Sequence, residues 1–189
     1  MKRIIQALAA LAISGGAIAQ PPPDPAALQA AQREALAKLA AMDGVWRGPA
    51  WSMRANGEKH QITQTERIGP FLGGTIKVIE GRGYDADGRV GFNAFGIIAY
   101  DPDKKAYNFR SYALGRFGDF KFDALSDGYA WEIATPGFTI RYVASIKDGK
   151  LREVGERIVP GRDPQRIFEM ELVRVGDTDW PLGIPVPPK

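Results

Sequence analysis

Cysteine is absent from this chain of 189 residues, and histidine occurs once, at His60. Without cysteine there is no disulfide, no thiolate metal site and no lipid-modified cysteine. The single histidine would have to serve as the base of any serine triad, and no serine lies in a nucleophile-elbow motif. The sequence therefore predicts neither a catalytic centre nor a metal site.

Long runs of one charge are also absent. The chain has 25 lysine and arginine residues against 22 acidic residues, a net charge of +3, and the basic residues alternate with acids. Without Lys2 and Arg3 the balance is 23 against 22, or +1. Because nucleic-acid binding needs clustered basic residues, we expect no nucleic-acid partner.

A short apolar run opens the chain. Two basic residues precede an uncharged stretch, residues 4–18, which ends in Ala17-Ile18-Ala19. This order is typical of a secretory signal, here residues 1–19, with cleavage before Gln20. The alternative is an uncleaved membrane anchor, although the run is shorter than the roughly 20 residues that span a bilayer. We expect an exported, periplasmic or extracellular protein that keeps no stable membrane anchor after cleavage.

Residues 20–43 combine a proline-rich linker with an amphipathic helix. Asp24 is a preferred helix N-cap, and Pro25 suits the first helical position. We expect this helix to end near Asp43 and to act as a lid or plug on the domain that follows, or else to pack on its outside. Its apolar residues recur at spacings of three and four: Leu28, Ala31, Ala35, Leu39 and Met42.

Beyond Gly44 the apolar pattern changes to a period of two, interrupted by turn sequences such as Asn56-Gly57. The pattern predicts an all-β domain over residues 44–176, an antiparallel up-and-down barrel of about ten strands with one N-terminal α-helix. The lack of helical crossovers favours a barrel over a sandwich. We expect a proline-rich tail over residues 177–189, at the surface or disordered. The predicted strands cover residues 45–54, 59–68, 72–83 (entered through Gly69-Pro70), 90–100, 105–113, 117–124, 129–134, 138–146, 151–159 and 166–175.

Two strands indicate which side chains face the barrel interior, because alternate residues of a strand share a face. Glu169 and Glu171 lie opposite the apolar face of the last strand, so we expect them in solvent rather than as a catalytic acid pair. The predicted inner faces are Phe138, Ile140, Tyr142, Ala144 and Ile146 in one strand, and Phe168, Met170, Leu172 and Arg174 in the other.

The stretch Gly44-Val45-Trp46-Arg47-Gly48 resembles the Gly-x-Trp opening of the calycin superfamily, which comprises lipocalins, fatty-acid-binding proteins and nitrobindin-like barrels. Together with 63–67, 70–74 and 168–174, it is similar to an exported bacterial family of lipocalin-like domains without an assigned function. The resemblance implies that Trp46 closes one end of the barrel, with Arg174 of the final strand lying across its indole. Such a cation–π contact is worth about 0.5–2 kcal/mol.

Nitrobindin-like barrels hold haem iron through a histidine near the C-terminal end. This chain departs from that pattern because His60 lies near the start of the second predicted strand, so we expect no cofactor. Arg110 and Tyr112 have the spacing of the carboxylate clamp of fatty-acid-binding proteins, but on another strand. Gly81 and Gly83 have the spacing of a phosphate loop without the helix that should follow, so we expect a bend or a bulge there.

The barrel interior is the predicted ligand site, because barrels of this size can enclose one small molecule. We expect the protein to bind or carry a small apolar molecule there without catalysis. A solid barrel that acts as a structural or homodimerising module is one alternative, which Trp51, Trp131 and Trp180 would support if exposed. A barrel enzyme of isomerase type is another, which buried paired carboxylates would favour. The predicted ligand-binding residues are Tyr107, Phe109, Phe138, Tyr142, Phe168 and Met170.

Overall fold

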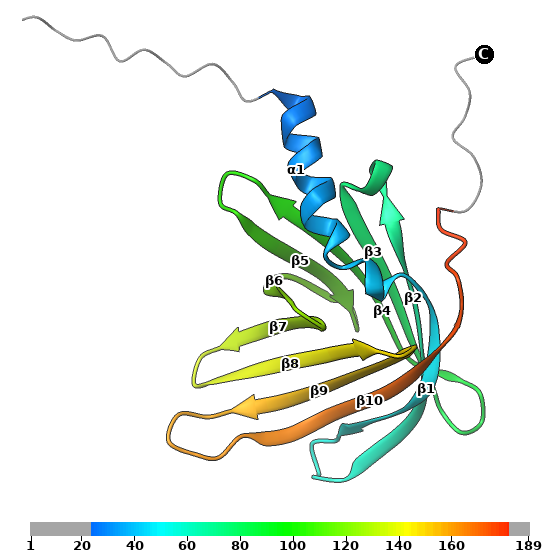
Figure 1. Ribbon diagram of the computed structural model, residues 1–189. Helices are drawn as coiled ribbons and strands as arrows, with labels where there is room; N and C mark the ends of the chain where they lie inside the picture. Colours follow the sequence, from blue (N-terminus) through cyan, green and yellow to red (C-terminus); the bar gives the residue numbers. More distant parts are fainter. Residues whose placement is uncertain (1–23, 182–189) are drawn as a thin grey trace, which may run out of the picture.

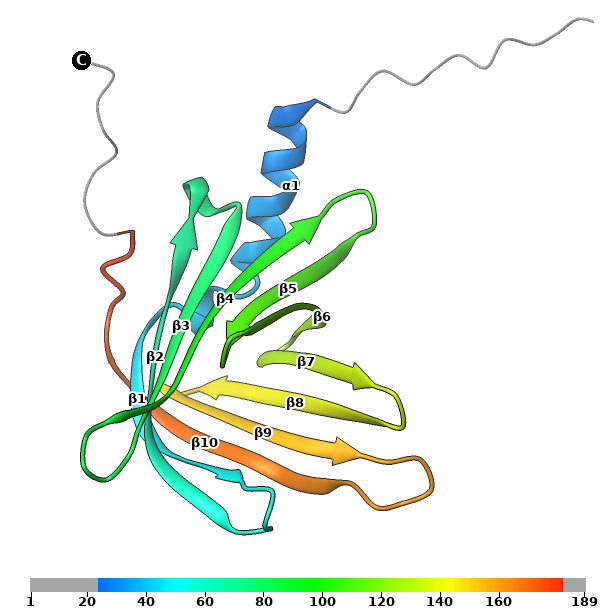
Figure 2. The ribbon, with the colours of Figure 1, turned by 180° about the vertical axis from the view of Figure 1, so that it is seen from behind.

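The computed structural model describes residues 24–181, and the predicted signal segment and residues 182–189 of the predicted tail lie outside this range. The described chain forms a closed barrel of ten antiparallel strands with one α-helix at its N-terminal side, which confirms the predicted fold class (Figures 1 and 2). The strands are β1 (Gly44–Met53), β2 (Lys59–Phe71), β3 (Ile76–Tyr84), β4 (Val90–Asp101), β5 (Ala106–Ala113), β6 (Arg116–Leu125), β7 (Gly128–Thr135), β8 (Phe138–Lys147), β9 (Lys150–Ile158) and β10 (Gln165–Gly176).

Each strand pairs with its neighbours in the sequence, and the barrel closes where β1 meets β10. Trp46 lies opposite Arg174 in this pair, and Ala50 lies opposite Met170. The strands come so close at Gly48 that a Cβ there would lie 2.1 Å from the Glu171 carbonyl oxygen. Glycine at this position is therefore required by the closure of the barrel.

Helix α1 (Pro25–Ala37) begins as the sequence predicts, with the Asp24 side chain accepting a hydrogen bond of 3.0 Å from the Ala26 amide. The predicted end near Asp43 is wrong, because the α-helix stops at Ala37 and a 3₁₀ turn, η1 (Ala40–Met42), follows. Leu39 leaves helical geometry (φ −101°, ψ 13°), and Leu39 and Met42 are both fully buried in the core. The break in the helix thus turns two large apolar side chains into the barrel.

Helix α1 packs against β3, β4 and the turn between β2 and β3 (Figure 1). The Tyr107 hydroxyl donates to the Ala35 carbonyl at 2.7 Å, and the Gln32 amide donates to the Tyr100 carbonyl at 3.3 Å. Together, α1 and η1 cover one end of the barrel, called here the helix end. No helix between residues 24 and 181 has the length and hydropathy needed to cross a membrane.

The third strand begins later than predicted. Strand β2 continues through Gly69 and Pro70 to Phe71, and a 3₁₀ turn, η2 (Leu72–Gly74), precedes β3. Pairing between β1 and β2 ends at Ile68, so the last residues of β2 pair with β3 alone. An edge position of this kind tolerates a proline, which explains why Pro70 does not end the strand.

The core follows the predicted inner faces of β8 and β10. Ala144, Met170 and Leu172 are buried, and Ile146 and Phe168 pack against the buried cluster. The barrel also buries polar side chains that an apolar pattern does not predict. They are Gln64, Lys77 and Glu153 inside the barrel, and Thr75 beside η2.

Candidate functional site

An aromatic wall lines the interior on the β5–β8 side and continues onto β10. Trp131 and Tyr142 stack with ring centroids 4.1 Å apart and planes 5° apart. Phe168 meets Tyr142 edge-on at 5.8 Å, and Phe109 meets Trp131 at 5.2 Å. Gly155 leaves space for this wall, because a Cβ there would lie 2.6 Å from a Tyr142 ring carbon.

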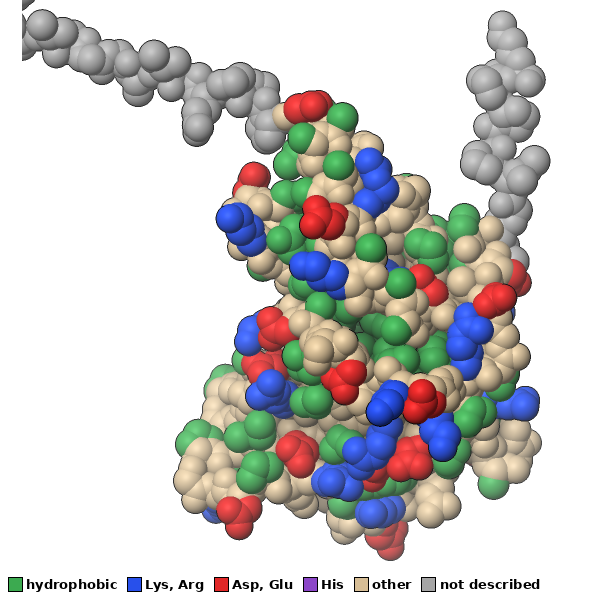
Figure 3. Space-filling model, in the orientation of Figure 1, with side chains coloured by type: hydrophobic (Ala, Val, Ile, Leu, Met, Phe, Trp, Pro, Cys, Tyr) green, Lys and Arg blue, Asp and Glu red, His purple; other side chains and the backbone are tan. Residues whose placement is uncertain are grey.

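The wall is not fully covered. Trp131, Tyr142 and Phe168 face inward and yet are only half-buried, whereas Ala144 and Met170 on the same faces are buried. Figure 3 shows the molecular surface hollowed between α1 and the strands below it, with hydrophobic side chains visible in the hollow. The interior therefore presents aromatic surface that this chain leaves unpacked.

Five of the six residues predicted to bind a ligand lie in or against this aromatic interior. Phe109 and Met170 are buried, and Tyr142 and Phe168 belong to the wall. Tyr107 lies at the helix end, where its ring packs on Tyr100 and its hydroxyl is engaged by α1.

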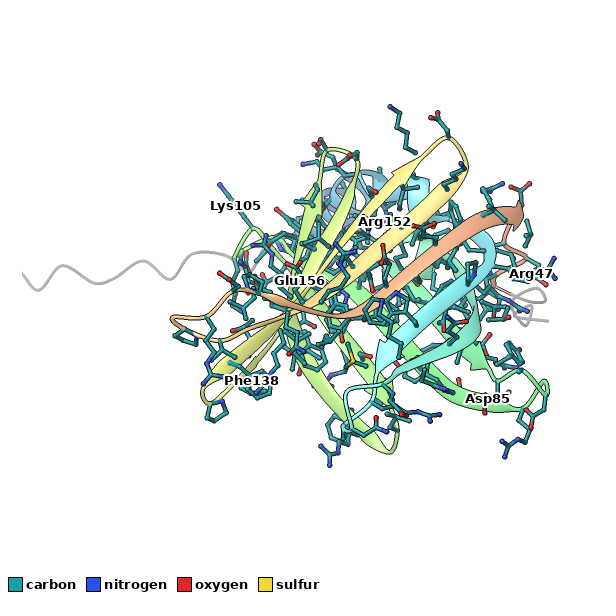
Figure 4. All side chains as sticks on the ribbon, turned by 90° about the horizontal axis from the view of Figure 1, so that it is seen from below. Arg47, Asp85, Lys105, Phe138, Arg152 and Glu156 are labelled. Atoms are coloured by element: carbon teal, nitrogen blue, oxygen red, sulfur yellow. The ribbon has the colours of Figure 1, made fainter. Side chains whose placement is uncertain are left out.

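Phe138 lies apart from the other five. It is the first residue of β8, at the end of the barrel away from α1, and the Arg157 guanidinium lies 4.5 Å from its ring centroid. Figure 4 shows Phe138 and Asp85 on opposite sides of the molecule when it is seen from below. This position places Phe138 at the rim of the barrel rather than in the wall.

Two carboxyl groups face the same interior from non-adjacent strands. Glu66 on β2 lies opposite Trp46 of β1, and Glu153 on β9 lies opposite Met170 of β10. Glu153 is 6% exposed, and Glu66 is half-buried and accepts a hydrogen bond of 2.7 Å from the Gln64 amide. Within residues 24–181, no basic side chain forms an ion pair with either carboxyl.

Two glycines on β3 provide the space for these polar side chains. Gly81 lies opposite Glu66, and Gly83 lies opposite Gln64. A Cβ on Gly81 would lie 2.8 Å from Glu66 Oε1, and one on Gly83 would lie 3.3 Å from Gln64 Oε1. The predicted bulge also exists, since the β3–β4 register shifts between Gly83 and Tyr84.

The environment favours the neutral form of both acids. Burial raises the pKa of Glu66 to about 8; the Gln64 hydrogen bond opposes this rise, and the charge of Glu153 adds to it. Burial likewise raises the pKa of Glu153 to about 7, partly offset by hydrogen bonding from Tyr129 and Trp131. Both acids therefore exchange protons near neutral pH, the range that suits general acid–base catalysis.

The same interior raises the pKa values of two phenols, Tyr142 and Tyr129. Burial, followed by the charge of Glu153, raises the pKa of Tyr142 to about 12 and that of Tyr129 well above its ordinary value. Both phenols therefore stay protonated at neutral pH. They can donate hydrogen bonds to a carboxylate or to a ligand atom.

Sequence reasoning missed this acid pair. On β2, Glu66 has the same strand parity as Ile62 and Ile68, so strict alternation would have placed it inside. On β9, Glu153 shares a face with Leu151, but the opposite face also carries apolar residues. The sequence of β9 alone therefore does not show which face is the inner one. The burial of Leu151 opposite Leu172 settles the inner face of β9.

Trp46 and Arg174 lie at the seam of the barrel near η1. Trp46 is 1% exposed, and its indole N–H donates to the Met42 carbonyl at 2.8 Å. The Arg174 guanidinium donates to the Asp43 carbonyl at 3.3 Å and to the Asp177 carboxylate at 2.6 Å. Among residues 24–181 no cation–π contact joins Arg174 to Trp46, so the expected contact across the indole is wrong. Arg174 keeps the strand parity of Met170 and Leu172, but its side chain is exposed at the helix end.

Both ring nitrogens of His60 have partners. Nε2 lies 3.0 Å from Asp85 Oδ1, and Nδ1 lies 2.8 Å from an Arg54 nitrogen. This arrangement leaves no ring nitrogen free to bind haem iron. In the part of the chain that the structure describes, no three histidine or acidic side chains come together as candidate metal ligands.

Several other features noted in the sequence lie on the outer surface. Arg110 pairs with Asp119 outside the barrel, with 2.9 Å between Nε and Oδ1, so it forms no interior clamp with Tyr112. Glu171 is exposed, and Glu169 is half-buried beside Arg152. Burial would raise the pKa of Glu169, but the hydrogen bond and charge of Arg152 outweigh it and lower that pKa.

None of the three tryptophans proposed for self-association is exposed. Trp131 faces the interior, as described above. On the outside, Trp51 lies beneath Lys59, with 3.8 Å between the ammonium nitrogen and the ring centroid. Trp180 packs edge-on against Phe71 at 5.6 Å.

Comparison with known proteins supports the fold. No protein-family model matches the sequence, and no curated protein does. The crystal structure of Rv2717c from M. tuberculosis is similar, with a TM-score of 0.55 and 12% identity, over 76% of this chain and 96% of that chain. At this identity the likeness shows a shared barrel architecture alone.

Proposed function

We propose that the protein binds a small, largely apolar molecule inside its barrel. The observation that carries this proposal is that Trp131, Tyr142 and Phe168 face inward but are only half-buried. Ligand sites in proteins are concave and lined mainly by apolar and aromatic side chains, with few polar groups. Glu66, Gln64 and Glu153 supply such polar groups on the inner faces of β2 and β9.

Titration with a lipophilic fluorophore tests this proposal. Uptake should be saturable at one site per chain. Tyr142→Ala or Phe168→Ala should weaken it by about tenfold, because each ring contributes a large apolar contact. Tyr112→Ala is the matched control, since Tyr112 is exposed on the outer face. Failure of every lipophilic probe to bind would overturn the proposal.

Membership of the calycin superfamily and export are part of the same proposal. The Gly-x-Trp opening and the ten-strand barrel are consistent with a calycin, and the first nineteen residues support export to the periplasm or the exterior. Mass spectrometry of the protein from an exporting host should find Gln20 as the first residue. A mature N-terminus at Met1 in the cytoplasm would contradict export.

Acid–base catalysis of the isomerase type is a second candidate function, favoured by the inward-facing acids Glu66 and Glu153. A proton moved between two carbon atoms needs one group that accepts it and then returns it, and acids that titrate near neutral pH suit that role. Deuterium incorporation from solvent into a panel of β,γ-unsaturated ketones, followed by NMR, tests this. No incorporation above the buffer rate would remove the candidate.

A third candidate function, self-association, is favoured by an apolar patch on the outer surface of β4, β5 and β6. Leu114 and Phe117 are 75% and 72% exposed, and Tyr112 stacks on Phe117 at 5.9 Å. These residues surround a depression of about 360 Å³. Light scattering should show a dimer that Phe117→Lys dissociates, and a monomer at all concentrations would exclude this role.

A further inference from the structure

We infer that the ligand of the barrel carries a positive charge, so that it is an apolar ammonium compound whose cation binds between Glu66 and Glu153. The inference rests on the proposed function and specifies the chemical class of the molecule. Three features of the interior support it: both carboxyls face inward, neither has a basic partner within residues 24–181, and aromatic side chains line the same interior.

The carboxyls face the barrel interior from two different strands. Glu66 belongs to β2 and Glu153 to β9, with β1 and β10 between these strands. Each side chain has the strand parity of buried residues, Ile68 in β2 and Leu151 in β9. The charge of Glu153 adds to the rise in the pKa of Glu66. Two ionised carboxylates in one apolar space repel, so an added cation would relieve an unfavourable interaction.

The chain itself supplies no counterion for this pair. Lys77 is the buried lysine inside the barrel, at 2% exposed, and its ammonium is bound by the Asp43 carboxylate at the helix end. Arg157 lies over Phe138 at the rim. Glu153 is therefore a deeply buried acid that faces the interior and, within residues 24–181, has no ion-pair partner. Such groups are rarely left without one.

The aromatic wall suits the same ligand. Trp131 lies on the inner face of β7, two residues from Tyr129, and both Tyr129 and Glu153 lie opposite Ala144 of β8. The Trp131 ring stacks on Tyr142. Aromatic faces attract cations, and tryptophan does so best. An ammonium group placed at the carboxyls would also lie near these rings, while its apolar body would extend along Tyr142 and Phe168. An anionic ligand would instead meet like charge at Glu66 and Glu153.

Proton release provides a signature of this mode of binding. A cation favours the ionised carboxylates, so binding to carboxyls that are partly neutral must expel protons into the solvent. The affinity for a cation should therefore rise as the pH increases through neutrality. A neutral ligand that accepts a hydrogen bond from a protonated carboxyl would show the opposite dependence.

A matched pair of probes tests the inference: 2-naphthylmethylamine, which is a cation, and 2-naphthylmethanol, which is neutral and of the same shape. Calorimetry at about pH 6 and about pH 8, in buffers that differ in ionisation enthalpy, measures affinity and proton release. The amine should bind about tenfold to a hundredfold more tightly than the alcohol at the higher pH, and should release protons.

Glu66→Gln and Glu153→Gln locate the effect. Each should reduce amine binding by about tenfold or more and leave alcohol binding within about twofold, which also shows that the variants are folded. Glu34→Gln is the control. Glu34 is exposed on α1, so this substitution removes one negative charge outside the barrel.

The outcomes separate the inference from the proposed function. If the alcohol binds as tightly as the amine, or if neither glutamine variant weakens the amine, the cationic class is overturned while the ligand-binding function stands. If neither probe binds, and lipophilic fluorophores also fail, the proposed function itself is overturned.

Discussion

Gly81 lies opposite Glu66 in the β2–β3 pair. Because Gly81 has no side chain, the Glu66 carboxyl can occupy the space beside it. A Cβ on Gly81 would lie 2.8 Å from one carboxyl oxygen of Glu66, 3.0 Å from the other and 3.2 Å from the Gln64 amide nitrogen. Contacts this short require the carboxyl or the amide to move. The position of the Glu66 carboxyl therefore depends on a glycine in the neighbouring strand.

Gly81→Ala should displace the Glu66 carboxyl and break its hydrogen bond with Gln64. Because the obstructing atoms are the ends of side chains, the fold should survive with a loss of about 1–3 kcal/mol in the free energy of unfolding. Binding of 2-naphthylmethylamine should weaken by about tenfold. Gly176→Ala is the control, because nothing lies within 4 Å of a Cβ at that position. Equal effects of the two substitutions would contradict this role for Gly81.

The buried acids should also make stability depend on pH. Their folded pKa values, about 8 for Glu66 and about 7 for Glu153, lie above the ordinary value of 4.5. Between 4.5 and these values the folded protein binds protons that the unfolded chain has released. The free energy of unfolding therefore falls as pH rises, by at most about 1.4 kcal/mol per pH unit for each acid. Below 4.5 both states are protonated, and the loss disappears.

Urea denaturation at a series of pH values between 5 and about 9 measures this loss. Glu66→Gln and Glu153→Gln should each flatten the decline, because glutamine is neutral at every pH, and each variant should exceed the wild type in stability at the alkaline end. Glu34→Gln should follow the wild type. A wild-type stability that rises through this range would show that the acids are not buried in solution as they are in the structure.

The fold could be predicted because its signals are local. Turn sequences such as Asn56-Gly57 and Lys147-Asp148-Gly149-Lys150 mark hairpins directly, and every strand pairs with its neighbours in the chain. The boundary near Gly69-Pro70 was wrong because the consequence of a proline depends on whether the strand has a partner there. That information lies in β1, whose first residue Gly44 pairs with Ile68, and not in the local sequence.

The site was predicted in part, for a different physical reason. Aromatic residues of the inner face, such as Tyr142 and Phe168, stand out because apolar alternation marks them. Glu66 and Glu153 do not, because an acid in a strand is usually in solvent. Alternation along β2 would have placed Glu66 inside, whereas the inner face of β9 is decided only by its pairing with β10. Glu66 lies between Ile62 and Ile68 on the inner face of β2, and Gly81 lies opposite it in β3.

Tyr107 should hold α1 on the barrel. Its hydroxyl donates to the Ala35 carbonyl at 2.7 Å, and a net hydrogen bond of this kind contributes about 0.5–1.5 kcal/mol. Tyr107→Phe should therefore increase the rate of amide hydrogen exchange in α1 by about two- to tenfold, with little change in the strands. Tyr112→Phe is the control, because Tyr112 is exposed and makes no contact with the helix. Unchanged exchange in α1 would show that apolar packing alone holds the helix.

Loss of the Trp46 side chain should reduce the free energy of unfolding more than any of the other substitutions. It is buried at the seam between β1 and β10, and its N–H donates to Met42, so it ties η1 to the first strand. Trp46→Ala should reduce the free energy of unfolding by about 3–5 kcal/mol, as expected for a buried aromatic residue. Trp46→Phe should cost less, because it keeps part of the apolar contact and loses the hydrogen bond. Trp51→Ala, on the outer face of the same strand, is the control. If urea denaturation gave Trp46→Ala and Trp51→Ala the same stability, the seam would not depend on the buried indole, and the role proposed for the Gly-x-Trp opening would be wrong.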